Sequence, residues 1–111
     1  MLLPSIAWQR LGDYLRETQL LGSIQNTLYW DQNTRMPPAG ASWRGEQLSF
    51  LAKQLHARQS SLQFEELLVN AKVEFEKSSR VGDFDERQIL ERSRNIELLE
   101  QDLVRQKNLD P

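Results

Sequence analysis

The chain has 111 residues, 39% of them hydrophobic, which supplies enough apolar material for one modest core and too little for two. Its 14 basic and 16 acidic residues give a formal net charge of -2, and because the two signs are interspersed we expect no nucleic-acid surface. Cysteine is absent, which excludes a disulfide framework and a thiolate metal site and fits a reducing compartment.

The first ten residues, MLLPSIAWQR, do not read as a targeting segment. No basic residue precedes their short apolar run, and Pro4 interrupts that run. They therefore fit neither a signal peptide nor a membrane span. We expect a cytoplasmic protein that has no membrane partner.

A long amphipathic helix is predicted over about residues 5–30. Its apolar residues recur at a spacing of three to four, or multiples of it, which places them on one face of a helix. They are Trp8, Leu11, Leu15, Leu21, Ile24 and Leu28. Gly12 and Gly22 weaken this helix, each by about 1 kcal/mol relative to alanine where the position is exposed.

The segment YWDQNTRMPPAG, Tyr29 to Gly40, is predicted to be a loop that forms a rigid corner. Met36 precedes a proline, which favours an extended backbone, while Pro37 and Pro38 stiffen the crossing. Gly40 can adopt a positive φ before the next helix. These properties suit a fixed angle between two helices.

The side chains of this corner can be explained by a structural role, in which they hydrogen-bond the backbone and pack between the two helices. Asp31 and Thr34 can hydrogen-bond backbone groups at the end of the preceding helix. Trp30 and Met36 can fill the space between the two helices. A structural role is therefore physically sufficient for the segment.

Three more helices are predicted, over about residues 41–58, 62–78 and 85–108. Their apolar stripes are Leu48, Leu51, Ala52 and Leu55; then Phe64, Leu67, Leu68, Ala71 and Phe75; then Ile89, Ile96, Leu99 and Leu103. Ser42 can cap the first of the three, Ser60 and Gln63 have capping-box spacing for the second, and Asp83 or Asp85 can cap the third. With no period-two segment, the fold class is all-α, with about four amphipathic helices in antiparallel hairpins.

No complete catalytic constellation can be found. His56 is the sole histidine, so the chain cannot supply a two-histidine zinc motif, and a packing or capping role is expected for it. Adjacent acids such as Glu65 and Glu66 do not face each other on a helix and are expected to be solvated. The serines lack a neighbouring base that would activate a nucleophile.

The corner and the helix after it nevertheless carry a specific pattern. The stretch from Tyr29 to His56 resembles the amino-terminal signature of the Taq-type metallocarboxypeptidases, in which Trp-Asp-Gln, a Thr-x-Met-Pro segment and an Arg-x-Glu-Gln-Leu helix follow one another. The matching residues are Trp30, Asp31, Gln32, Thr34, Met36, Pro37, Pro38, Gly40, Arg44, Glu46, Gln47, Leu48 and Leu51. The charged helix near the carboxyl end extends the resemblance, more loosely, to all 111 residues.

This resemblance implies the amino-terminal part of a larger helical zincin with a neurolysin-like fold, which releases carboxyl-terminal amino acids from peptides. Its His-Glu-x-x-His helix is absent from this chain, so residues 1–111 are expected to form one noncatalytic helical domain, a lid or wall of the substrate groove. No cofactor is expected on the chain itself, and zinc or cobalt is implied for the full-length parent. The implied partners are the remainder of the peptidase and its peptide substrates. The resemblance also implies that the full-length parent is a homodimer.

Two alternatives follow from the residues. Arg44 or Asp31 could touch substrate directly, because the guanidinium donates two parallel bonds to a carboxylate, although an ion pair of Arg44 with Glu46, Glu65 or Glu66 is equally available. A stand-alone helical interaction module fits the composition as well as a peptidase segment does. Exposed apolar patches containing Trp8, Trp43 or Phe50 would favour the segment of a larger domain.

Overall fold

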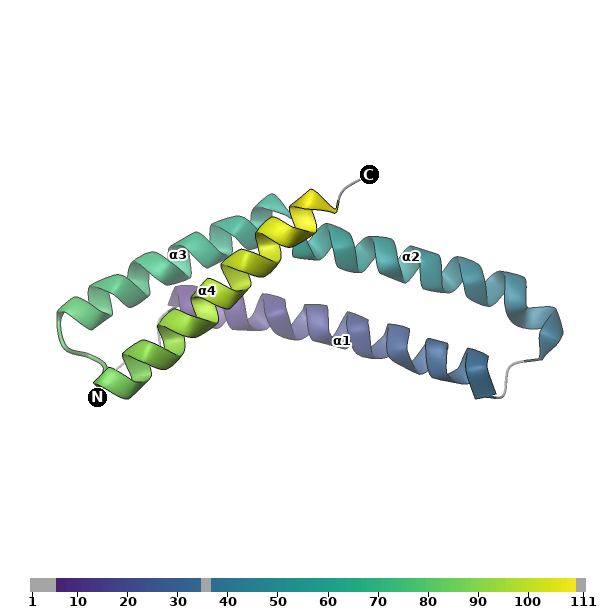
Figure 1. The fold of residues 1–111 in the computed structure, drawn as a ribbon, viewed down its shortest axis with the longest axis horizontal. Coiled ribbons are helices and arrows are strands. Elements are labelled where there is room, and N and C mark those ends of the chain that lie inside the picture. The colour runs from purple at the N-terminus through teal and green to yellow at the C-terminus, as the bar shows by residue number, and fades with distance from the viewer. Residues whose placement is uncertain (1–5, 35–36, 110–111) are drawn as a thin grey trace.

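The computed structural model of the chain describes residues 6–34 and 37–109 (Figure 1). Its helices are α1 (Ile6–Thr34), α2 (Ala41–Gln59), α3 (Leu62–Arg80) and α4 (Glu86–Asn108), and a short 3-10 turn, η1 (Pro38–Gly40), precedes α2. No strand occurs in these two ranges, which confirms the all-α fold class. Nor does any helix within them have the length and apolar character needed to cross a bilayer.

The helices are arranged around the long first helix. α2 and α3 follow each other with a two-residue joint at Ser60 and Ser61, and together they run back along α1, α2 beside its carboxyl-terminal half and α3 beside its amino-terminal half (Figure 1). α4 turns back over α3 and reaches α2 near the joint. Three helices, α1, α3 and α4, therefore pack together at one end of the molecule, and two, α1 and α2, at the other.

The buried core lies entirely at the thicker end. Its residues come from α1, α3 and α4, and they are Leu11, Tyr14, Phe64, Leu68, Ala71, Phe75, Ile96 and Leu103. We call this part the base, consisting of residues 6–19 of α1 together with α3 and α4. All nine residues of the stripes predicted for the third and fourth helices are buried or packed against the core, as periodicity indicated: Phe64, Leu67, Leu68, Ala71, Phe75, Ile89, Ile96, Leu99 and Leu103.

The thinner end, which we call the arm, consists of residues 20–34 of α1, residues 37–40 and residues 41–55 of α2. None of its described residues is fully buried. The molecule measures 61 × 30 × 20 Å and its radius of gyration is 18.1 Å, against about 13 Å for a compact domain of this length. A two-helix hairpin thus projects from a small core.

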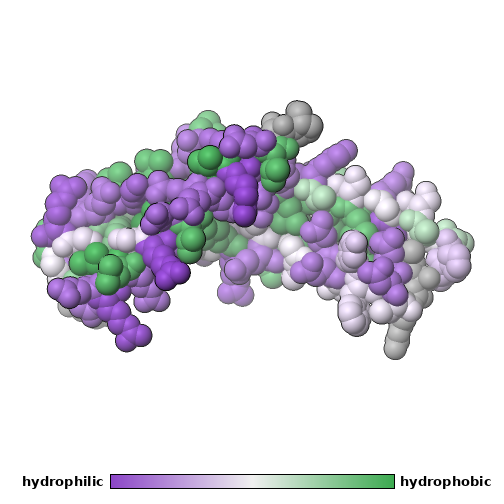
Figure 2. All heavy atoms as spheres, viewed as in Figure 1, coloured by the Kyte–Doolittle hydropathy of each residue, from purple (hydrophilic) through white to green (hydrophobic). Residues whose placement is uncertain are grey.

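The extended shape leaves an unusually large surface. The chain exposes 8457 Å², about a third more than the roughly 6,300 Å² typical of a monomeric protein of 13.0 kDa. Apolar side chains reach the surface along both the base and the arm (Figure 2). Among the residues predicted to share the buried face of the first helix, Ile24 is 51% exposed, because the arm provides no third element to cover it.

Side chains cap the starts of α3 and α4, whereas α2 begins without a side-chain cap. α4 begins after Asp85, which accepts a hydrogen bond from Gln88 N while its own N–H donates to the Gln88 side chain, so Asp85 rather than Asp83 is the N-cap. α3 is capped by Ser61, one residue later than predicted, because Ser61 Oγ is the atom that accepts from Phe64 N. The prediction of Ser42 as a cap is wrong, since α2 already begins at Ala41.

The first turn of α1 is stabilised from another helix. Ala7 N donates to Glu74 Oε2 of α3 at 2.9 Å. The first N–H groups of a helix have no partner within it, and a carboxylate there also complements the positive end of the helix dipole. Glu74 thereby fixes the amino-terminal end of α1 against the base.

Candidate functional site

The residues of the predicted corner divide between a helix and a turn. α1 continues to Thr34, so the prediction that the loop begins at Tyr29 is wrong: Trp30, Asp31, Gln32 and Thr34 belong to its last turns. No proline or glycine lies between Gly22 and Pro37, which is consistent with the helix continuing past Tyr29. Thr34 donates from Oγ1 to Trp30 O at 2.8 Å, a bond within the helix.

The connection itself is short. Pro37 is extended, with φ -62° and ψ 144°, and Pro38 opens the turn η1, in which Gly40 N donates to Pro37 O at 3.0 Å. Gly40 has φ -89°, so the predicted positive φ is wrong: the residue enters α2 directly in a right-handed helical conformation. The predictions for Met36 lie outside the described residues.

Arg44 connects the two helices of the arm. Its Nη1 donates to Asp31 Oδ2 at 2.9 Å and to Leu28 O at 2.8 Å, and its Nε donates to Gln47 Oε1 at 3.0 Å. The Arg44 side chain is only 16% exposed, whereas that of Asp31 is 46% exposed. The guanidinium therefore joins the end of α1 to the start of α2, and we call this group of four residues the arm clasp.

The arm clasp bears on the two sequence-based interpretations of Arg44, as an ion-pair residue or as a substrate-binding residue. Arg44 forms its ion pair with Asp31, not with Glu46, Glu65 or Glu66. Glu65 instead pairs with Lys107 of α4, whose Nζ lies 2.7 Å from Glu65 Oε2. Glu46 is exposed on α2. Three bonds hold the guanidinium within the arm, which favours an architectural role for Arg44 over a bond to a substrate carboxylate.

Large aromatic side chains are exposed on both helices of the arm. Trp30 is 73% exposed, so the prediction that it fills the space between the helices is wrong, and Gln32 is half-buried. Trp43 and Phe50, seven residues apart on one side of α2, are 66% and 60% exposed. The arm thus presents aromatic surface of the kind that is enriched in protein–protein contacts.

A second polar cluster, which sequence reasoning missed, fixes the joint between α2 and α3. The buried Tyr14 donates from its hydroxyl to Arg58 O at 2.7 Å and lies 2.9 Å from Ser61 Oγ. The Arg58 guanidinium stacks 4.0 Å from the centre of the Tyr14 ring and donates from Nε to Thr18 Oγ1 at 3.0 Å. The sequence indicates the burial of Tyr14 only indirectly, because Tyr14 lies three residues after Leu11 and therefore on the same face of the first helix.

Side chains that could bind a metal ion do not converge in the described part of the chain. Across residues 6–34 and 37–109, no group of three or more His, Cys, Asp or Glu side chains is placed to hold a metal ion. His56 lies instead at the contact of α2 with α4, where its Nδ1 is 3.2 Å from Gln106 Oε1. The donor set of the described chain does not fit a catalytic divalent metal, and no metal-dependent step can be derived from it.

Comparison with known proteins provides an independent result. The family model described as Carboxypeptidase Taq (M32) metallopeptidase matches residues 10–110. Thermostable carboxypeptidase 1 from Thermus thermophilus is 40% identical over 55 residues, which are 50% of this chain and 11% of that protein. The aligned part is therefore a small share of the relative. No solved structure matches the chain.

Proposed function

Because the chain belongs to the carboxypeptidase Taq (M32) metallopeptidase family, we propose that it serves as the amino-terminal helical region of a metal-dependent carboxypeptidase. The whole enzyme releases carboxyl-terminal amino acids from peptides and uses zinc or cobalt bound by residues outside this chain. The observation that carries the proposal is the family match, which spans residues 10–110. The 40% identity to a thermostable carboxypeptidase supports the same assignment.

The proposed contribution of this chain is to form a wall or cover of the substrate groove. The arm is the part shaped for this role, since it projects from the base and is two helices thick. The arm clasp stiffens it: Asp31, Arg44 and Gln47 all belong to the pattern shared with the family, and all three take part in one set of hydrogen bonds. A stiff wall admits extended peptides and hinders folded proteins.

The exposed surface supports the proposal that further polypeptide packs on this chain. Trp43 and Phe50 are exposed, as expected for a segment of a larger domain, whereas Trp8 is half-buried beneath Arg92, whose guanidinium carbon lies 4.8 Å from the Trp8 ring centre. The proposed partners are the remainder of the peptidase and, through it, peptide substrates. A homodimeric parent in the cytoplasm completes the proposal.

A chimera tests the function. Residues 10–110 replace the corresponding segment of the Thermus thermophilus carboxypeptidase, and release of carboxyl-terminal amino acids from peptides is measured with and without added zinc or cobalt. We expect metal-dependent activity from the chimera and none from the 111-residue chain. Circular dichroism verifies that both proteins are folded. A folded, metal-loaded chimera that cleaves nothing, beside an active parent enzyme, contradicts the proposal.

Two substitutions in the chimera separate an architectural arm clasp from a substrate-binding arginine. Asp31→Ala and Arg44→Met break the same ion pair, so an architectural role predicts similar changes of kcat/KM, within about threefold of each other. A bond from Arg44 to the substrate carboxylate predicts instead that Arg44→Met raises KM alone. An interaction module without peptidase function predicts that the chimera is inactive whichever residue is changed.

A further inference from the structure

The arm clasp has a counterpart at the carboxyl-terminal end of α2. Arg58 Nη2 donates to Tyr14 O of α1 at 2.9 Å and to Glu17 Oε2 of α1 at 3.3 Å. The Nε atom of the same arginine donates to Thr18 Oγ1 at 3.0 Å. We call this group of four residues the base clasp. It fastens the end of α2 to the part of α1 that belongs to the base.

The two clasps repeat one arrangement. In each, a single terminal nitrogen of an α2 arginine donates both to a carbonyl oxygen of α1 and to the carboxylate three residues further along α1, while Nε donates to an uncharged side chain. Arg44 and Arg58 are fourteen residues apart, and so are the residues that supply the two carbonyl oxygens, Leu28 and Tyr14. Two heptads have this length, so both arginines lie on the same side of α2. Equal separations on both helices are what one antiparallel register requires.

Between the clasps, the contact of α1 with α2 is less specific. Leu21 of α1 and Leu48 and Leu51 of α2 are half-buried, and none of the described residues of the arm is fully buried. Similar leucines that recur at helical spacing permit shifted pairings as well as the native one. A guanidinium, in contrast, donates in fixed directions, and a helical carbonyl oxygen has a second lone pair that can accept such a bond. The clasps are therefore the contacts that select the register.

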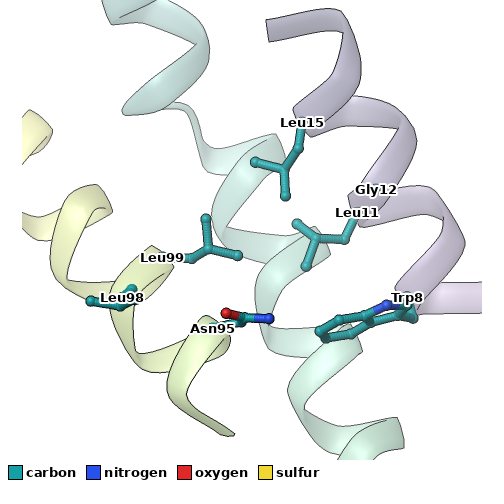
Figure 3. A pocket seen from close by; sticks show the side chains of 7 residues that line it. All are labelled: Trp8, Leu11, Gly12, Leu15, Asn95, Leu98 and Leu99. Atoms are coloured by element: carbon teal, nitrogen blue, oxygen red, sulfur yellow. The ribbon is translucent and has the colours of Figure 1, made fainter. Parts of the chain in front are cut away.

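The contact of α1 with α4 is of a different kind. A groove of about 350 Å³ lies between these two helices, and Figure 3 shows Leu11 and Leu15 of α1 facing Leu99 of α4 across it. Most of the side chains that line the groove are apolar. Contacts of this kind hold α1 on the base but do not select its alignment with α2.

We propose that the two clasps form a register lock, which holds α1 and α2 in one antiparallel alignment so that the arm behaves as a single rigid body. While either clasp is closed, its bonds keep the groups of the other close together, so the open clasp re-forms in the correct register. The two clasps therefore substitute for each other: loss of one leaves the alignment unchanged, and loss of both releases it. The inference does not depend on the proposed peptidase function.

Distances between spin labels test the lock. The chain contains no cysteine, so labels attach only to introduced ones. Asn26→Cys with Ser49→Cys places labels at exposed positions on α1 and α2 of the arm, and double electron–electron resonance measures the distribution of the distance between them. We expect a narrow distribution for the chain with both arginines and for Arg44→Met or Arg58→Met alone. Replacing both arginines should make the distribution at least about twice as wide.

A matched pair of substitutions and a second label pair serve as controls. Arg44→Met with Arg94→Met also removes two arginines, but Arg94 is exposed on α4 outside both clasps, so the arm distribution should stay narrow. Labels at Asn70→Cys and Gln101→Cys, exposed positions on α3 and α4, should give a narrow distribution in every variant. An unchanged arm distribution in Arg44→Met/Arg58→Met overturns the proposal. A single variant that widens the distribution as much as the double variant overturns it as well.

A milder replacement separates loss of the lock from misfolding of the base. The Arg58 guanidinium also stacks 4.0 Å from the centre of the Tyr14 ring, so Arg58→Met can loosen the core. Arg58→Lys keeps a cation near the ring but lacks the planar fork that serves three acceptors at once. Combined with Arg44→Met, it should widen the arm distribution while the distribution between α3 and α4 stays narrow. An arm distribution that widens only together with that of α3 and α4 means that the base unfolds, and refutes the lock.

Discussion

Single polar side chains fix the positions of whole helices in this molecule. Tyr14 is the clearest case: its ring stacks on Phe64, with centroids 5.6 Å apart, while its hydroxyl reaches the joint between α2 and α3. One residue thus contributes apolar burial to the core and a hydrogen bond to a helix end. Arg44 has the corresponding role in the arm, where no buried core assists it.

Replacing Tyr14 by phenylalanine isolates the hydroxyl. The ring and its stacking remain, but Arg58 O and Ser61 Oγ lose their bonds to it, and we expect a loss of about 1–2 kcal/mol in the free energy of unfolding. Urea denaturation measures this loss. Tyr29→Phe is the control, since Tyr29 is 59% exposed and should change stability by less than about 0.5 kcal/mol. Equal effects of the two substitutions would contradict the assigned role.

The sequence predicted the helices better than the contacts between them. Spacing of apolar residues identified α3 and α4 correctly, because a core covers their apolar stripes. The same spacing misassigned Ile24 to the buried face of α1, because the arm has no third helix to cover that face. Asp31 and Arg44 were each singled out, yet their pairing was not predicted. It requires α1 to continue to Thr34, and composition alone favoured a loop there.

At the scale of the helix, α4 depends on its first turn. Few of its residues are buried, so the capping box at Asp85 and Gln88 supplies a larger share of its stability than a cap does in a well-covered helix. Asp85→Ala should therefore lower the free energy of unfolding by about 1 kcal/mol. Asp83→Ala, which leaves the cap intact, should change it by a few tenths at most. Thermal unfolding followed by circular dichroism measures both, and a larger effect at Asp83 would reverse the assignment.

For the whole molecule, the unequal thickness predicts unequal stability. Helical amides in the arm, residues 24–31 and 45–55, should exchange with solvent at least about tenfold faster than those at 64–75 and 96–103 in the base, because the arm can open without exposing the core. Hydrogen exchange read by mass spectrometry or NMR measures both sets in one sample. Uniform protection would mean that the arm opens only when the entire chain unfolds.

The unbroken backbone of α1 has a mechanical consequence. This helix has 29 residues and passes from the base to the tip of the arm, so it acts as a lever about 44 Å long. Its fulcrum is the Tyr14 contact, from which Thr34 is separated by about 30 Å of helix. A rotation of about 5° at the fulcrum therefore carries the tip through roughly 2–3 Å, which converts a small repacking of the base into a displacement as large as a side chain.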